Sequence, residues 1–257
     1  MIKKDQPTIF GDEIICGVSS IDDGQMKFGS TESDDEVIQN RRQFLTRLGI
    51  RIEDTVLVKI KYTDSSINDV IKTVSQADAG NGMFNSEAEP TDCLVTNTPG
   101  LALFVPVADC GATIIYDPKN QVLALAHLGR HSTISLVPKK LTKYLKDNFQ
   151  TDPTDLKVWI SPSISSGSYV LKHADFAKDN PDWGKYCKKV DGGYAIDNAG
   201  FNKSQFIKYG VRAENIELSN VDTAKSKDYW SHHHEVTVKG KPVPPRFAVA
   251  TSLKTNN

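Results

Sequence analysis

Three apolar, β-prone runs stand close together in the centre of the chain. They cover residues 101–107, 113–116 and 121–126, and the last two are separated by the turn sequence Asp117-Pro-Lys-Asn. Short apolar runs of this kind are typical of strands buried inside a sheet. The centre of the chain therefore predicts a buried β-sheet with reactive groups placed at the strand ends, where a rigid scaffold positions them.

The flanking sequence alternates between extended and helical patterns. We expect further strands over 13–18, 55–62, 156–160, 215–218 and 246–252, helices over 34–48, 132–149 and 195–209, and an exposed loop over 76–90. No internal repeat or interdomain linker interrupts this order. The pattern predicts the α/β (mixed α+β) class, with one domain over residues 1–257 and a mixed β-sheet core flanked by helices.

Charge and hydropathy narrow the classes of partner. The 31 Lys and Arg residues balance 32 Asp and Glu residues, which gives a formal net charge of −1. No strong global field draws in nucleic acid or an anionic membrane. The most apolar stretch, residues 100–108, is far shorter than the roughly 20 residues of a membrane span, and the first ten residues lack the apolar block of a secretory signal. We therefore expect a cytoplasmic protein without nucleic-acid or membrane partners.

Cys110 and His127 form the sharpest local constellation. Cys110 follows Asp109 between the first two central runs, and His127 follows the third run. If these strands are neighbours, the thiol and the imidazole can meet as a nucleophile with its base, or as two ligands of a transition metal. Asp109 is either a carboxylate that orients the histidine or a loop cap. The alternative is an inert buried cysteine with a histidine at a helix start. The four cysteines contain no CxxC pair, and reduced thiols fit them best.

The central sequence resembles a known family. The run DCLVTNTPGLALFVPVADC, residues 92–110, resembles the D-A-L-V-T…P-G…A-D-C block of the bacterial laccase-domain proteins, also called multicopper polyphenol oxidases and associated with purine nucleoside phosphorylase activity. Further blocks match in order over nearly the whole chain, at residues 17–20, 34–50, 126–129, 216–219, 222–223, 229–231 and 246–248. This ordered set is far more specific than any single motif.

The resemblance implies a fold, a metal and a reaction. The fold is the laccase-domain or cysteine-hydrolase-like fold, and the metal is usually zinc held by two histidines and a cysteine. Cys110 matches the family cysteine and His127 the second histidine, while Thr63 occupies the position of the first histidine. The implied reaction is cleavage of purine nucleosides such as adenosine and inosine by phosphate, with adenosine deamination beside it, in a protein that we expect to be a monomer.

Several departures from the family pattern fall near this site. Thr is a poor zinc ligand, so two protein ligands remain where a catalytic zinc site normally has three. Arg130 and His131 replace a family Trp-Arg pair. Candidate replacement ligands are Asp64, Asp222, His131, His232 and His234. The alternative for the triplet 232–234 is an exposed hairpin without a role.

The resemblance also suggests substrate contacts. Asn40, Arg41 and Arg42 lie in a family block, and arginine suits phosphate because its guanidinium binds oxyanions in a bidentate way. A solvated helix face is the alternative for them. His131 and, among the tryptophans, Trp230 are the other candidates for substrate binding.

Three functions follow. The first is a zinc-assisted purine nucleoside phosphorylase, the second a non-catalytic relative that binds a ligand or partner, and the third a metal-free hydrolase with Cys110 as nucleophile and His127 as base. Copper oxidase chemistry is not expected, because six histidines, three of them consecutive, do not form the His-x-His sets that several copper centres need.

Overall fold

The three central runs form strands in the computed structural model, which describes residues 5–29, 32–60 and 70–255. The second and third runs pair with each other, and the first lies in a different sheet. They are β5 (Ala102–Val107), β6 (Gly111–Asp117) and β7 (Val122–Leu128), and each is buried along its whole length. The β6–β7 turn forms as predicted, because the Asp117 carboxylate accepts hydrogen bonds from the backbone N–H groups of Lys119 and Asn120, at 3.0 and 3.1 Å.

Two larger sheets carry the fold, and both mix parallel and antiparallel pairs. The first has the order β1-β13-β5-β2 and the second the order β12-β8-β6-β7-β4-β3. Besides the central strands, they contain β1 (Ile14–Val18), β2 (Thr55–Leu57), β3 (Ile71–Thr73), β4 (Cys93–Thr96), β8 (Lys157–Ile160), β12 (Ile216–Leu218) and β13 (Phe247–Leu253). The predicted mixed sheet is therefore present as two sheets.

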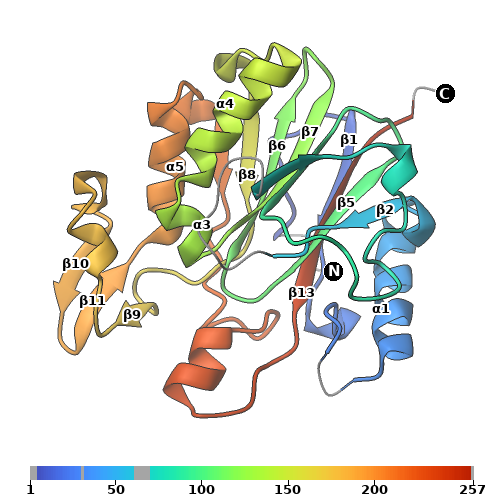
Figure 1. The fold of residues 1–257 in the computed structure, drawn as a ribbon. Coiled ribbons are helices and arrows are strands. Elements are labelled where there is room, and N and C mark those ends of the chain that lie inside the picture. The colour runs from blue at the N-terminus through green and yellow to red at the C-terminus, as the bar shows by residue number, and fades with distance from the viewer. Residues whose placement is uncertain (1–4, 30–31, 61–69, 256–257) are drawn as a thin grey trace.

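The sheets stack face to face with helices on their outer faces (Figure 1). The helices are α1 (Asp34–Arg47), α3 (Arg130–Ile134), α4 (Val137–Phe149) and α5 (Asn198–Lys208). Both faces of β5 are apolar and buried, which explains this layering. Leu103 and Val105 enter the core between the sheets, and Phe104, on the opposite face of the strand, packs under α1. On the second sheet, Leu125 enters that central core and Ala124 packs toward α4. The predicted α/β class is confirmed.

Local signals at the ends of α1 match the predicted helix. Ser33 and Glu36 form a capping box, in which Ser33 Oγ accepts from the Glu36 N–H and the Glu36 carboxylate accepts from the Ser33 N–H. Gly49, just past the helix, has a φ of 74°, a left-handed conformation that favours glycine.

The helix predicted over 132–149 is instead two helices, α3 and α4. Pro138 lies in the first turn of α4, and Leu136 before it adopts a left-handed conformation with φ 58° and ψ 46°. Proline lacks the N–H that a continuous helix would need there, and its ring clashes with the preceding turn. The chain therefore stops and restarts around Leu136.

A small third sheet was not predicted. Its strands are β9 (Val170–Leu171), β10 (Cys187–Val190) and β11 (Gly193–Ile196), in the order β10-β11-β9. Strand β11 occupies the start of the helix predicted over 195–209, because Asp197 caps α5 by accepting from the Gly200 N–H. The Trp183 ring stacks on the Phe201 ring at 3.8 Å and joins this sheet region to α5.

Short helical turns join these elements. The 3-10 turns are η2 (Ile21–Asp23), η3 (Ile52–Asp54), η4 (Gln76–Asp78), η5 (Pro153–Asp155), η6 (Asp175–Ala177), η7 (Pro181–Trp183) and η8 (Ala213–Asn215). No helix in the described part of the chain is both long and apolar enough to cross a membrane.

The core between the sheets predicts how far the free energy of unfolding falls when a side chain of a central strand is shortened. Leu125 of β7 is fully buried there, so Leu125→Ala is expected to lower the free energy of unfolding by about 3 kcal/mol through lost contacts and a cavity. Val238→Ala removes apolar atoms at a position that is 62% exposed and is expected to change it by less than about 0.5 kcal/mol. Urea unfolding followed by circular dichroism measures both; equal losses would contradict this view of the core.

Candidate active site

The pairing of β6 with β7 brings Cys110 and His127 together. The antiparallel register places Gly111 opposite Leu128 and Ala112 opposite His127. Cys110 immediately precedes Gly111 and packs against the core between the sheets, and its side chain is hydrogen-bonded to His127. The predicted meeting of thiol and imidazole is present.

Gly129 leaves open the space that this pair shares. A Cβ at position 129 would lie 2.8 Å from Cys110 Sγ and 2.8 Å from His127 Nε2. Any other residue would push into both groups. The glycine therefore keeps a small space into which the sulfur and one ring nitrogen both point.

Asp92 orients the histidine. It directly precedes β4, whose first residue, Cys93, pairs with Ala126 of β7. The Asp92 Oδ1 atom lies 3.1 Å from His127 Nδ1, and the Asp92 carbonyl accepts from the His127 N–H at 2.7 Å. Burial alone would lower the pKa of His127, which is 3% exposed, but the interactions with Cys110 and Asp92 outweigh it and raise the pKa to about 9. Cys110, His127 and Asp92 thus form a connected chain of side chains.

Asp109 holds the loop that carries Cys110, and Asp92 is the carboxylate that orients the histidine. Its Oδ1 accepts from the Thr223 hydroxyl and its Oδ2 from the His233 N–H, both at 2.6 Å. Its backbone has a φ of 79°, and its carbonyl accepts from the Ile164 N–H. Of the two predicted roles, the loop cap is the one formed: Asp109 ties the loop that carries Cys110 to two distant segments.

Tyr169, Arg130 and His233 complete the surroundings of Cys110. The Tyr169 ring meets the His233 ring edge to face at 5.1 Å, and its hydroxyl is hydrogen-bonded to the Arg130 side chain. Burial raises the pKa of Tyr169, with the nearby charges of Arg130 and Cys110 acting in opposite directions. The sequence analysis did not identify Tyr169 or Asp92 as site residues. No periodic pattern marks Tyr169, and Asp92 is seen in the sequence only as an acidic residue at the start of an apolar run.

The histidine triplet is not an exposed hairpin. Residues His233–Val238 form a π-helix, and His233 is only 8% exposed. Hydrogen bonds from the His233 N–H to Asp109 and from the His234 N–H to Ser231 Oγ hold the start of this turn. Asp109 is distant in the sequence and Ser231 is a local cap, and the sequence pattern of the triplet indicates neither contact.

The candidate substrate residues of α1 are held by the protein itself. Asn40 donates to the Gln25 carbonyl and to Glu32, and Arg42 forms a 2.7 Å ion pair with Glu53. In Figure 1, α1 and α3 lie on opposite sides of the stacked sheets. The roles of Asn40 and Arg42 in substrate binding stay predictions.

Arg41 is 1% exposed and donates to three backbone carbonyls. Its Nε reaches Met26 O at 2.9 Å, and Nη1 reaches Gly82 O and Met83 O at 3.0 and 2.9 Å. Its guanidinium lies 4.0 Å from the centre of the Phe28 ring. Burial lowers its pKa to about 9, which leaves it charged at neutral pH. The residue ties loops to α1, and its predicted contact with substrate stays a prediction.

The other candidates lie at the rim of the site or elsewhere. His131 is exposed on α3, and Trp230 is half-buried against the core between the sheets. Asp222 accepts from the hydroxyls of Ser165 and Ser168, both at 2.7 Å, and so closes a loop. Thr63 and Asp64 fall outside the described residues.

The donors match zinc in kind but not in number. A thiolate and an imidazole whose other nitrogen meets a carboxylate are the arrangement that zinc ligands usually show. Within residues 5–29, 32–60 and 70–255, however, no group of three His, Cys, Asp or Glu side chains is placed to hold a metal ion. The described residues therefore do not by themselves fit a catalytic zinc ion, and zinc stays a prediction.

Comparison with known proteins settles the family. A family model described as multi-copper polyphenol oxidoreductase laccase matches residues 15–243. The chain belongs to this family. The solved YfiH of Bacillus licheniformis superposes with a TM-score of 0.85 at 21% identity, over 95% of this chain and 94% of that one. YlmD of Geobacillus stearothermophilus gives 0.82 at 20% identity, over 95% and 93%. The resemblance seen in the sequence and the expected fold are confirmed.

Several curated relatives in this family are named purine nucleoside phosphorylases. One from Corynebacterium glutamicum is 25% identical over 227 residues, 86% of each chain. YlmD of Bacillus subtilis is 22% identical over 217 residues, 82% of this chain and 76% of that protein. A Bacteroides thetaiotaomicron relative is 28% identical over 149 residues, 56% of this chain and only 53% of its own length. The homology is distant.

The contacts of Arg41 predict a structural role for this family member. Arg41→Met removes three hydrogen bonds and leaves carbonyls without their charged donor, so the free energy of unfolding is expected to fall by about 3 kcal/mol. Arg42→Met makes the same chemical change at a half-exposed ion pair and is expected to lose less than about 1 kcal/mol. Urea unfolding at neutral pH measures both, and a loss for Arg41→Met no larger than that for Arg42→Met would refute the structural role.

Asp222 predicts a pH-dependent contribution to stability. Burial acts to raise its pKa, but hydrogen bonds from Ser168 and Ser165 outweigh it and hold the pKa below the ordinary 3.8. The folded state therefore gains stability at pH values above 3.8, and this gain is lost as pH falls through the folded pKa.

Asp222→Asn is accordingly expected to lower the free energy of unfolding by about 1 kcal/mol at pH 7, with a smaller deficit near pH 3. Asp191→Asn, at an exposed turn, serves as the control. Urea titrations at both pH values test this, and a deficit that grows on acidification would contradict it.

Proposed function

We propose that this protein cleaves purine nucleosides with phosphate at the site formed by Cys110, His127 and Tyr169. The observation that carries the proposal is the convergence of Cys110 Sγ and His127 Nε2 on the open face of Gly129, with Asp92 fixing the ring. The family relatives named purine nucleoside phosphorylases support the substrate class.

The residues present suggest how the reaction would proceed. A phosphate oxygen forms a bond to the ribose C1′ as the bond from C1′ to the purine nitrogen breaks, and the bond pair leaves with the base. The departing purine needs a proton, which His127 Nε2 can deliver while Asp92 stabilises the charged ring. The rings of Tyr169 and His233 supply an aromatic wall for the base. No step is assigned to zinc, because the described residues supply two ligands for it.

The test is phosphate-dependent release of free base. Purified untagged protein is incubated with inosine or adenosine, with and without inorganic phosphate, and the base and ribose 1-phosphate are separated by chromatography. We expect phosphate-dependent turnover that falls at least about 100-fold in His127→Ala and Cys110→Ala. Cys187→Ala, at a half-buried cysteine of β10, is the matched control and retains activity. Absence of turnover in the wild type, with metal content checked by mass spectrometry and zinc restored, would overturn the proposal.

The same three connected side chains also favour a second function. Cys110, His127 and Asp92 have the order of a nucleophile, its base and an orienting acid, as in a metal-free cysteine hydrolase. Burial raises the pKa of Cys16 to about 12 and that of Cys93 further, so these thiols are poor competitors. Alkylation by iodoacetamide that labels Cys110 first, without any nucleoside cleavage, would favour this function. Monomeric state, cytoplasmic location and adenosine deamination stay predictions.

A further inference from the structure

A cavity lies on the face of the first sheet that points away from the core between the sheets. Its lining includes Pro106 of β5, which alternates with Val105 and Val107, two residues that enter that core. The cavity has a volume of about 230 Å³. Neither Cys110 nor His127 is among the described residues that line it. It is therefore a separate feature of the fold from the candidate active site.

The lining of this cavity is mostly apolar. Its apolar side chains are those of Phe28, Leu57, Val58, Ile60 and Pro106. The Phe28 ring is held in place by the buried Arg41 guanidinium, which lies 4.0 Å from its centre and is itself fixed by backbone carbonyls. A hydrocarbon or aromatic body that displaces water from such a lining gains free energy.

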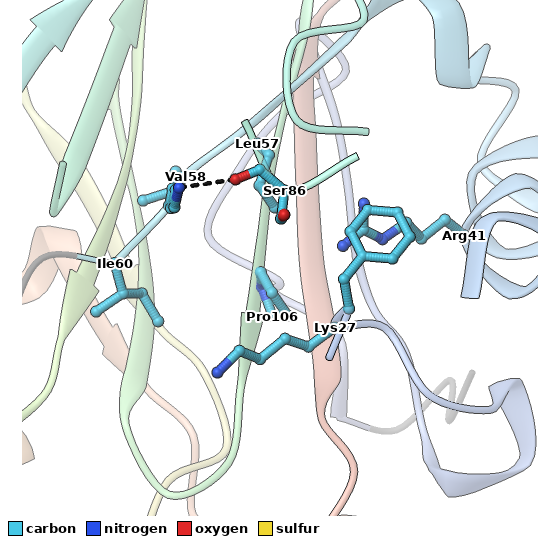
Figure 2. Close-up of a pocket in the computed structure, with 9 residues that line it drawn as sticks. Lys27, Arg41, Leu57, Val58, Ile60, Ser86 and Pro106 are labelled. Carbon is cyan, nitrogen blue, oxygen red and sulfur yellow. Dashed lines mark hydrogen bonds between the residues drawn. The ribbon is translucent and has the colours of Figure 1, made fainter. Parts of the chain in front are cut away.

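Two lysine side chains, Lys27 and Lys59, complete the lining. Figure 2 shows the Lys27 side chain running beneath Pro106, with its amine on the side of Ile60. Lys59 Nζ donates to the Ser86 carbonyl at 2.7 Å, the hydrogen bond drawn at Ser86 in Figure 2. An ammonium group has three N–H donors, so this hydrogen bond positions the Lys59 amine and leaves it further donors.

No carboxylate of the protein balances these two positive charges. No Asp or Glu is among the described residues that line the cavity, and neither lysine forms an ion pair with any residue in the described part of the chain. Burial and the charge of Arg246 both lower the pKa of Lys27, as expected for an amine without a compensating negative charge. The cavity is therefore complementary to an anion.

The backbone that carries Lys27 is fixed by a buried amide. The Gln25 side-chain carbonyl accepts from the Lys27 N–H at 3.0 Å and from the Arg246 N–H at 2.7 Å, and Gln25 is 1% exposed. These are backbone hydrogen bonds of Lys27 and Arg246. A substitution of the Lys27 side chain consequently leaves them in place.

We propose that this cavity binds a small aromatic monocarboxylate, with its carboxylate on Lys27 and Lys59 and its ring against Phe28 and Pro106. The mostly apolar lining favours one charge on an apolar body over a compact, strongly hydrated anion such as phosphate. The volume lies below the roughly 300–1,000 Å³ typical of pockets for drug-sized ligands, so the ligand is small. The ammonium groups supply charge-assisted hydrogen bonds to the carboxylate.

Binding of benzoate to the full-length protein tests the proposal. Isothermal titration calorimetry is expected to show benzoate binding in the millimolar range or tighter. Benzamide has the same ring and nearly the same shape but no charge, and it is expected to bind at least about tenfold more weakly. Inorganic phosphate is expected not to displace benzoate.

Substitution of Lys27 tests the predicted contact. Lys27→Met keeps the apolar stem and removes the amine, and it is expected to weaken benzoate binding about tenfold. Lys188→Met, at an exposed position of β10, makes the same change in net charge and is expected to leave the affinity within about twofold. Circular dichroism and thermal unfolding check that both variants fold.

Three results would overturn the proposal. The first is wild-type protein that does not bind benzoate, and the second is benzamide binding as tight as benzoate binding. The third is equal weakening in Lys27→Met and Lys188→Met, which would show that no specific contact with Lys27 exists.

Competition with inosine separates this proposal from the phosphorylase function. Benzoate binding that is unchanged by saturating inosine supports a separate ligand site, whereas displacement by inosine would assign the cavity to nucleoside binding and overturn the proposal. Benzoate binding that depends on Lys27, in a protein that cleaves no nucleoside, would support the cavity site while the phosphorylase function fails.

Discussion

The pairing of β7 with both of its neighbours is the constraint on which the site depends. Strand β6 brings Cys110 to one side of His127, and strand β4 brings Asp92 to the other. A shift of either register by one residue would turn the side chains to the opposite face of the sheet. The register itself is fixed because Leu123 and Leu125 must enter the core between the sheets. The strand register that packs the apolar core is therefore also the register that places the polar groups.

The polar groups around this pair are held by segments that are far apart in the chain. Asp109 connects the Cys110 loop to Thr223 and to His233, and Gln25 fixes Lys27 beside Arg246. Each of these connecting side chains is buried and satisfied by hydrogen bonds, so each is costly to disturb. The segments that carry Cys110, Lys27 and Arg246 are consequently held in place by buried hydrogen bonds. Such preorganisation is what the proposed reaction between a nucleoside and phosphate would need.

The chain belongs to the laccase family, and Cys110 and His127 are the residues predicted to match the family cysteine and one family histidine. The described residues place two soft donors and an orienting carboxylate around the open face of Gly129, and no three-ligand group among them. The likeness to solved structures at about one-fifth identity shows the fold, and the chemistry is carried by these particular residues.

The sequence by itself determined the central strands, α1 and the family, because apolar periodicity, turn residues and ordered motifs are local signals. It left the meeting of Cys110 and His127 conditional on the pairing of their strands, which the structure supplies. It missed the break at Leu136 and the strands β9–β11, where capping and proline effects override periodicity. Only the tertiary structure decided that Asp92 rather than Asp109 orients His127, that Arg41 is buried with its guanidinium donating to carbonyls, and that Gln25 accepts from the backbone of both Lys27 and Arg246. These contacts join residues distant in sequence, and their geometry follows from strand register and side-chain packing, which no local pattern encodes.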